Sequence, residues 1–203
     1  MKLFLAFAAA VAAAYAGVRL AIRREDATHP AGAGSASHTR RMVRCAMIAA
    51  VYAVLCLILA PFSYGAVQVR VAEMLTLLPV FGAEYIVGVT LGCFLANLFG
   101  STLPDVVFGT AATLLACLFT YKLRNVRIKG LAIPAAIPPV VFNAVIVGVE
   151  ISVFFSDTPA TLPILLWNGF TVGLGEIVSC VILGVALVRL IESNAGLRRI
   201  FQE

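Results

Sequence analysis

Two pairs of amide and carboxylate side chains are the residues of this chain best suited to bind a polar ligand. Glu150 follows Asn143 by seven residues and Glu176 follows Asn168 by eight, so each pair lies on one face of a helix. A carboxylate inside an apolar membrane helix is costly, and such residues usually face a cavity and act on a ligand or an ion. With Trp167 as a neighbouring aromatic surface, these residues predict a ligand pocket in preference to a purely structural polar network.

Three further charged residues interrupt the apolar sequence ahead of these pairs. Arg70 and Glu73 are three residues apart on one helix face, which suits either a helix-stabilising ion pair or a gating role. Asp105 follows Pro104 in the first turn of a predicted helix, where the helix dipole stabilises a carboxylate. Asp105 is therefore expected to stabilise the helix start.

The sequence lacks the patterns that catalysis would need. It has no GxxxxGK[ST] phosphate loop, no HExxH and no GxSxG, and no histidine falls within a predicted span of the main bundle. Asp105 is the one aspartate in a predicted helix of that bundle, so an intramembrane aspartate pair is not expected. Five cysteines stand singly without a CxxC, which predicts neither disulfides nor zinc. We expect no enzymatic activity, no metal and no cofactor.

Composition places the chain in the membrane. Hydrophobic residues make up 62% of the 203 residues and charged residues 12%, whereas soluble domains carry about 25% charged residues. The basic residues flank apolar runs, as cytoplasmic loops do under the positive-inside rule, and form no continuous basic face for nucleic acid. The sequence therefore predicts an all-α integral membrane protein.

A membrane-spanning helix needs about 20 predominantly apolar residues. Four stretches meet that length, and two shorter ones between Pro61 and Pro104 must cross an even number of times for the flanking basic clusters to lie inside. The predicted helices are Met42–Ala60, Arg70–Leu78, Ala83–Phe99, Pro104–Tyr121, Leu131–Phe155 and Pro163–Ile191, with a turn at Pro79–Gly82. They give a six-helix transmembrane domain over residues 40–203 with both ends in the cytoplasm.

The N-terminal region forms a separate unit. Residues 1–24 resemble a signal peptide, with Lys2, an apolar run and a small-residue site at Ala14-Tyr15-Ala16. Cleavage would leave Arg40 and Arg41 outside, so charge placement favours an uncleaved extra membrane helix. Residues 25–39, rich in small residues and containing both histidines, are expected to be a flexible cytoplasmic linker.

Small residues predict close helix contacts. Ala46, Ala49, Ala50 and Ala53 form a stripe on the first helix of the bundle, and GxxxG pairs occur at Gly88/Gly92 and Gly169/Gly173. Such stripes let helix backbones approach closely. The alanine stripe suits packing inside the bundle or an outward docking face.

The polar segment between the first two long spans resembles the hallmark of the QueT family of queuosine-precursor transporters. It reads Pro61-Phe62-Ser63-Tyr64-Gly65, Val67-Gln68-Val69-Arg70-Val71-Ala72-Glu73 and Leu75-Thr76-Leu77-Leu78-Pro79. Similar stretches are Gly92-Cys93-Phe94-Leu95-Ala96-Asn97-Leu98, Asp105-Val106-Val107-Phe108-Gly109-Thr110 and Gly173-Leu174-Gly175-Glu176. The resemblance covers about residues 40–192, with Gln68, Arg70, Glu73, Asn97 and Asp105 as its polar positions.

This resemblance implies a substrate-binding S component of an energy-coupling factor (ECF) transporter. Such a protein is a six-helix bundle with its pocket near the outer face. Its partners are a transmembrane coupling protein and two cytoplasmic ATPases, and an AxxxA stripe on the first helix docks on the coupling protein, as Ala46/Ala50 or Ala49/Ala53 would here. The expected cargo is a 7-deazaguanine such as preQ1 or preQ0, or queuine, and which carboxylate meets it stays open.

Three alternatives differ in what they predict. An S component for another metabolite, such as a vitamin, would keep the scaffold and change the ligand. A non-transport membrane scaffold would bind no ligand and no ATPase. A secondary transporter driven by protons through Glu150 or Glu176 would keep its uptake when the ATPases are lost.

Overall fold

The computed structural model describes residues 16–17, 20, 34–63, 69–156 and 159–202. Within them the chain is helical, apart from one isolated β-bridge between Ile128 and Leu131. The elements are α2 (Gly34–Ser63), η1 (Val71–Val80), α3 (Glu84–Gly100), α4 (Leu103–Lys122), α5 (Ile133–Glu150), η2 (Ile151–Phe155), α6 (Leu162–Glu176), η3 (Ile177–Gly184), α7 (Val185–Ser193) and α8 (Ala195–Gln202). The predicted all-α class is confirmed for this part of the chain.

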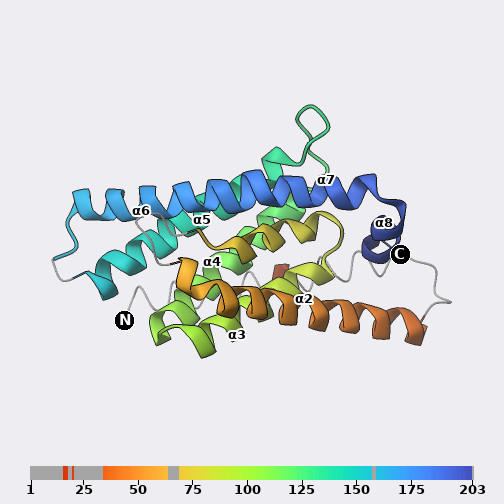
Figure 1. Ribbon diagram of the computed structural model, residues 1–203, viewed down its shortest axis with the longest axis horizontal. Coiled ribbons are helices and arrows are strands. Elements are labelled where there is room, and N and C mark those ends of the chain that lie inside the picture. Colours follow the sequence, from red (N-terminus) through yellow and green to blue (C-terminus); the bar gives the residue numbers. More distant parts are fainter. Residues whose placement is uncertain (1–15, 18–19, 21–33, 64–68, 157–158, 203) are drawn as a thin grey trace.

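Four helices are long and apolar enough to cross a membrane. They are Thr39–Ala60, Leu103–Lys122, Ile133–Phe155 and Leu162–Ser193, and each matches a predicted span to within a few residues. Val71–Val80 and Glu84–Gly100 are shorter apolar helices, as expected for the segment that its charges interrupt. Figure 1 shows the long helices running side by side, with α6 and α7 in one continuous line. The chain is a multi-pass membrane protein.

The element η1 lies at the centre of the bundle. Eight of its ten residues are buried, and it contacts α2, α3, α4, α5, α7 and η3 (Figure 1, yellow). It is a 3₁₀-helix, with Glu73 N–H donating to the Arg70 carbonyl at 2.9 Å. Such helices rarely exceed three or four residues and often mark functional positions. The predicted turn at Pro79–Gly82 begins later than expected, because Pro79 and Val80 still belong to η1.

The predictions for the N-terminal region fall largely outside the described residues. The extra helix over residues 1–24 lies almost entirely there, as does most of the linker over 25–39. Of the predicted linker, residues 34–39 are described, and they are helical because α2 begins at Gly34.

Glycines hold two pairs of helices at very short distances. A Cβ atom added to Gly92 in α3 would lie 2.8 Å from the carbonyl oxygen of Ala49 in α2. One added to Gly148 in α5 would lie 2.6 Å from the Cα of Gly169 in α6. We call these contacts the α2–α3 seam and the α5–α6 seam. They confirm the close approach predicted from the small-residue pairs.

Candidate functional site

Four of the polar residues singled out in the sequence meet inside the bundle. Glu73 on η1, Asn143 and Glu150 on α5, and Glu176 at the end of α6 are 1%, 3%, 2% and 4% exposed. Asn143 and Glu176, together with Arg70, line one small cavity of about 10 Å³, which has room for about one water molecule. Residues more than a hundred positions apart thus form one buried group, which we call the polar centre and define as Arg70, Glu73, Asp105, Asn143, Glu150 and Glu176.

Glu73 is held from one side and open on the other. The Tyr52 hydroxyl in α2 donates a hydrogen bond to Glu73 Oε1 at 2.5 Å. The second carboxylate oxygen, Oε2, is buried without a hydrogen-bond partner. A buried acceptor left in this way is costly, so it is a candidate contact for a ligand N–H group.

Cys180 joins Glu73 and Glu176. Its Sγ lies 3.2 Å from Glu176 Oε2 and 3.4 Å from the Glu73 carbonyl oxygen, so η3 is fixed against η1 at this point. Thr76 Oγ1 donates to the same Glu73 carbonyl at 2.6 Å. The buried Asn143 side chain lies against the Glu73 and Glu176 carboxylates, although its Nδ2 makes no hydrogen bond of regular geometry. The cavity therefore presents the Glu176 carboxylate and the Asn143 amide, with Arg70 beside them.

The other side of the polar centre carries the remaining carboxylates. Arg70 Nη2 lies 3.7 Å from Asp105 Oδ1, and the Ser101 hydroxyl donates to Asp105 Oδ2. Both carboxylate oxygens of Glu150 are buried without a hydrogen-bond partner. The ion pair considered between Arg70 and Glu73 is therefore replaced by one between Arg70 and Asp105, while Tyr52 satisfies Glu73. Asp105 keeps its expected place in the first turn of α4.

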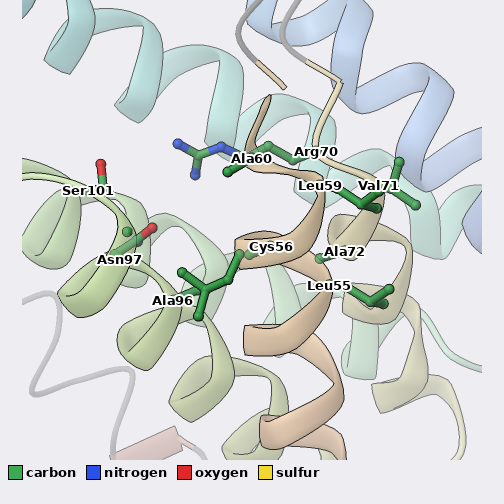
Figure 2. A pocket seen from close by; sticks show the side chains of 12 residues that line it. Leu55, Cys56, Leu59, Ala60, Arg70, Val71, Ala72, Ala96, Asn97 and Ser101 are labelled. Carbon is green, nitrogen blue, oxygen red and sulfur yellow. The ribbon is translucent and has the colours of Figure 1, made fainter. Parts of the chain in front are cut away.

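Arg70 borders two cavities. It lines the internal one with Asn143 and Glu176, and it lines a larger one bounded by the ends of α2 and α3. Figure 2 shows its guanidinium extending across the larger cavity towards the side where Asn97 and Ser101 lie. Asn97 Nδ2 donates to the Asp105 carbonyl at 3.0 Å, which fixes the start of α4 against α3. This position is compatible with the gating role considered for Arg70.

Both amide–carboxylate helices change geometry directly after their glutamate. The α-helix α5 ends at Glu150 and continues as the π-helical η2, and α6 ends at Glu176 and continues as the π-helical η3. π-Helical turns are rare and occur often at functional sites, because they leave the regular backbone ladder locally offset. The two carboxylates thus stand at equivalent breaks in their helices.

The structure does not bring every predicted pocket residue together. Trp167 is 65% exposed on α6, with its ring 6.3 Å from that of Phe170, so it lies on the outer surface. Asn168 Nδ2 donates to Ser152 Oγ at 2.9 Å and ties α6 to η2 beside the site. Gln68 lies outside the described residues.

The alanine stripe on α2 divides between two faces. Ala49 is 3% exposed and lies in the α2–α3 seam, and Ala53 is partly buried against the core. Ala46 and Ala50 are exposed. Of the two candidate docking pairs, Ala46/Ala50 faces outward.

Sequence reasoning missed Tyr52 and Cys180 as members of the site. A tyrosine in the middle of an apolar span needs a partner for its hydroxyl, and this signal could have identified Tyr52. Cys180 gave no such signal, because a single cysteine usually behaves as a small hydrophobe. Among the described residues, no group of His, Cys, Asp and Glu side chains has the arrangement of a metal site.

Comparison with known proteins also identifies a family of membrane transporters. Residues 42–193 match the protein family described as QueT transporter. A relative named queuosine precursor transporter QueT, from Lactococcus lactis subsp. cremoris (strain MG1363), is 40% identical over 80 residues, which are 38% of this chain. That match spans about half of the relative, 47% of its length. No solved structure matches the chain. Because the family match covers most of the chain and all six residues of the polar centre, the protein belongs to the QueT transporter family.

Proposed function

We propose that this protein is the substrate-binding S component of an ECF-type importer and takes up queuosine precursors of the 7-deazaguanine class. The observation that carries the proposal is the polar centre, where Asn143 and Glu176 line a small cavity and where Glu73, Asn143 and Glu150 each keep buried polar atoms without a regular hydrogen bond. Such an arrangement costs free energy in the empty protein and is compensated when a complementary ligand binds. Membership of a transporter family agrees with this use and with the absence of enzymatic motifs.

The carboxylates of the cavity suit a guanine-like edge. That edge presents adjacent ring and exocyclic N–H donors, and an ionised carboxylate accepts two hydrogen bonds side by side. Glu176 and the free Oε2 of Glu73 are the acceptors for this edge. The free Nδ2 of Asn143 is the donor for the carbonyl of the base. Val147 and Val172, which line the same cavity, replace Trp167 as the apolar surfaces against the ring.

The formal charges of the polar centre favour a cationic cargo. Arg70 is its one cation; it pairs with Asp105 and interacts electrostatically with Glu73, Glu150 and Glu176. An aminomethyl substituent on the deazaguanine supplies a second positive charge, and Glu150 has both oxygens available to receive it. The proposal therefore ranks the aminomethyl precursor above the uncharged nitrile.

The outward face of α2 is the proposed docking surface for the coupling protein. Ala46 and Ala50 are exposed, and exposed apolar side chains surround them: Met42, Val43, Met47, Val51, Val54 and Ile58. A small-residue face bordered by apolar side chains allows another membrane helix to approach closely. In the proposed architecture, this surface lies on the first helix of a six-helix S-component bundle that is preceded by an additional N-terminal hydrophobic helix.

Uptake of tritiated aminomethyl-deazaguanine tests the proposal. A host without its own transporter would express this chain alone, with the coupling protein and active ATPases, or with inactive ATPases. We expect uptake only with the active module, and competition by unlabelled deazaguanines but not by vitamins. Uptake that survives inactive ATPases would indicate secondary transport, and competition by a vitamin alone would indicate another cargo.

A further inference from the structure

The connection between α4 and α5 forms an ordered hairpin that takes no part in the substrate site. We call residues 122–131 the basic hairpin. Ile128 and Leu131 exchange both backbone hydrogen bonds, at 3.0 and 2.9 Å, and the two residues between them have positive φ angles, 50° at Lys129 and 77° at Gly130. Positive φ at both central positions is the signature of a type I′ turn, the tight turn of two-residue hairpins. The connection between α4 and α5 therefore has a regular, hydrogen-bonded hairpin structure.

An ion pair fixes the orientation of this hairpin. Arg127 Nη2 lies 2.7 Å from Glu192 Oε1 at the end of α7. Side chains alternate along an extended segment, so Val126 and Ile128 point to the opposite side from Arg127. They are 47% and 49% exposed, although both are apolar. The hairpin thus presents two branched aliphatic side chains away from the bundle.

The surroundings of the hairpin have the features of a membrane–water boundary. Lys122 Nζ lies 5.0 Å from the centre of the Phe119 ring, and Phe119 itself is 41% exposed on the outer side of α4. Arg124 lies 4.0 Å above the ring of Tyr121. Aromatic rings with adjacent basic groups are typical of helix ends at the membrane interface. Figure 1 shows the hairpin projecting sideways from the bundle, across the direction of the long helices.

We propose that the basic hairpin is a docking element for the anionic lipid surface of the cytoplasmic leaflet. In this position Val126 and Ile128 enter the boundary between headgroups and acyl chains, and the exposed Lys122 and Lys129 bind lipid phosphates. Two observations favour a lipid surface: the basic charge of the hairpin complements anionic headgroups, and its direction across the helices lies in the membrane plane. The site is separate from the polar centre and does not rest on the proposed function.

Tryptophan fluorescence of the full-length protein in lipid nanodiscs tests this proposal. Trp167 is the single tryptophan, so Trp167→Phe provides a silent background for Val126→Trp and Ile128→Trp. Asn125→Trp is the control, because Asn125 is exposed in the turn that precedes the extended segment. We expect blue-shifted emission and strong quenching by lipids labelled near the headgroup at positions 126 and 128, and water-like emission at position 125. Water-like emission at all three positions would overturn the proposal.

A second experiment tests whether the positive charge of the hairpin contributes to its binding of anionic lipids. Labelled phosphatidylglycerol should quench the Ile128→Trp probe more than labelled phosphatidylcholine, and high salt should reduce the difference. Replacing Lys122 and Lys129 by glutamine should lower this lipid preference about fivefold for each lysine. An unchanged preference in the double variant would contradict the proposal. An emission shift that appears only when the coupling protein is added would assign the hairpin to a protein interface instead.

Discussion

The two helix seams are closely packed, whereas the polar centre contains a cavity. In the α2–α3 and α5–α6 seams, glycines bring backbones so close that a single added carbon would contact Ala49 or Gly169 at under 3 Å. In the polar centre, a few residues away along the same helices, carboxylate and amide groups surround a cavity and several of their atoms have no partner. Gly148 and Glu150 show the contrast within one helical turn of α5.

This difference in packing suggests different roles: the seams stabilise the fold, and the polar centre is the candidate site. A seam with no spare volume holds its two helices at a fixed separation, because close-packed protein interiors have low compressibility. That rigidity holds the unpaired carboxylates in place when each of them would be more stable in water. We infer that the seams supply stability that offsets the cost of burying the polar groups of the polar centre.

The largest expected effect comes from adjacent alanines on α2. Ala49→Trp should abolish folding, because the indole would have to enter the α2–α3 seam beside Gly92. Ala50→Trp should fold and bind substrate, because Ala50 is exposed, yet fail to copurify with the coupling protein. Gel filtration in detergent and copurification measure the two outcomes. An Ala50→Trp protein that still copurifies would remove this face from the docking surface.

The second effect concerns substrate affinity. Glu176→Gln exchanges one acceptor oxygen for a donor that faces the donor edge of the base, which should cost on the order of 2–3 kcal/mol. The dissociation constant for the deazaguanine should rise about thirtyfold or more, measured by calorimetry. The matched control is Glu192→Gln, which removes the ion pair with Arg127 outside the polar centre and should leave the affinity unchanged. Equal affinities for Glu176→Gln and wild type would make Glu176 structural.

The third effect concerns stability at the α5–α6 seam. Gly148→Ala should lower the free energy of unfolding by about 1–3 kcal/mol, because its Cβ meets the Gly169 backbone at 2.6 Å. Gly173→Ala is the control, since its Cβ would contact the Ala144 Cβ at 3.4 Å, and its stability should stay within about 1 kcal/mol of wild type. Denaturation in mixed detergent micelles measures both. A Gly148→Ala variant as stable as Gly173→Ala would show that α5 and α6 can move apart to accommodate the added Cβ.

The smallest effect tests the support of Glu73. Tyr52→Phe removes the hydrogen bond to Glu73 Oε1 and should weaken deazaguanine binding by roughly three- to tenfold, or about 1 kcal/mol. Tyr85→Phe removes a comparable bond, at 3.0 Å to the Phe201 carbonyl, far from the polar centre. It should change thermal stability but not affinity. Similar affinity losses in both variants would indicate a general loss of packing.

The sequence predicted most of the helices and singled out all six residues of the polar centre, but not Tyr52 and Cys180 beside them. Apolar runs and basic flanks located the four long spans, because length and hydropathy dominate membrane insertion. Glu150 and Glu176 were recognised because a carboxylate in an apolar helix is expensive wherever it lies. The 3₁₀ geometry of η1 was not predictable, since it depends on burial among most of the other helices.

Other features of the site depend on how the helices pack together. Helix periodicity placed Trp167 beside Asn168 but gave no information on which face turned inward, and the tryptophan lies outside. The partner of Arg70 proved to be Asp105, thirty-five residues away, instead of its helical neighbour Glu73. The Arg70–Asp105 pair follows from the packing of α4 against η1, and the outward position of Trp167 follows from the packing of α6 against α5. Local spacing encodes neither contact.

An experimental structure of the protein with aminomethyl-deazaguanine bound tests the central claim most directly. The account predicts the base in the polar centre, with its donor edge on Glu176 and Glu73, its carbonyl on Asn143 and its ammonium group on Glu150. The unpaired atoms of Glu73, Asn143 and Glu150 should each gain a partner within about 3 Å. Ligand density elsewhere, for example in the larger cavity beside Asn97 and Ser101, with these atoms still unpaired, would contradict it.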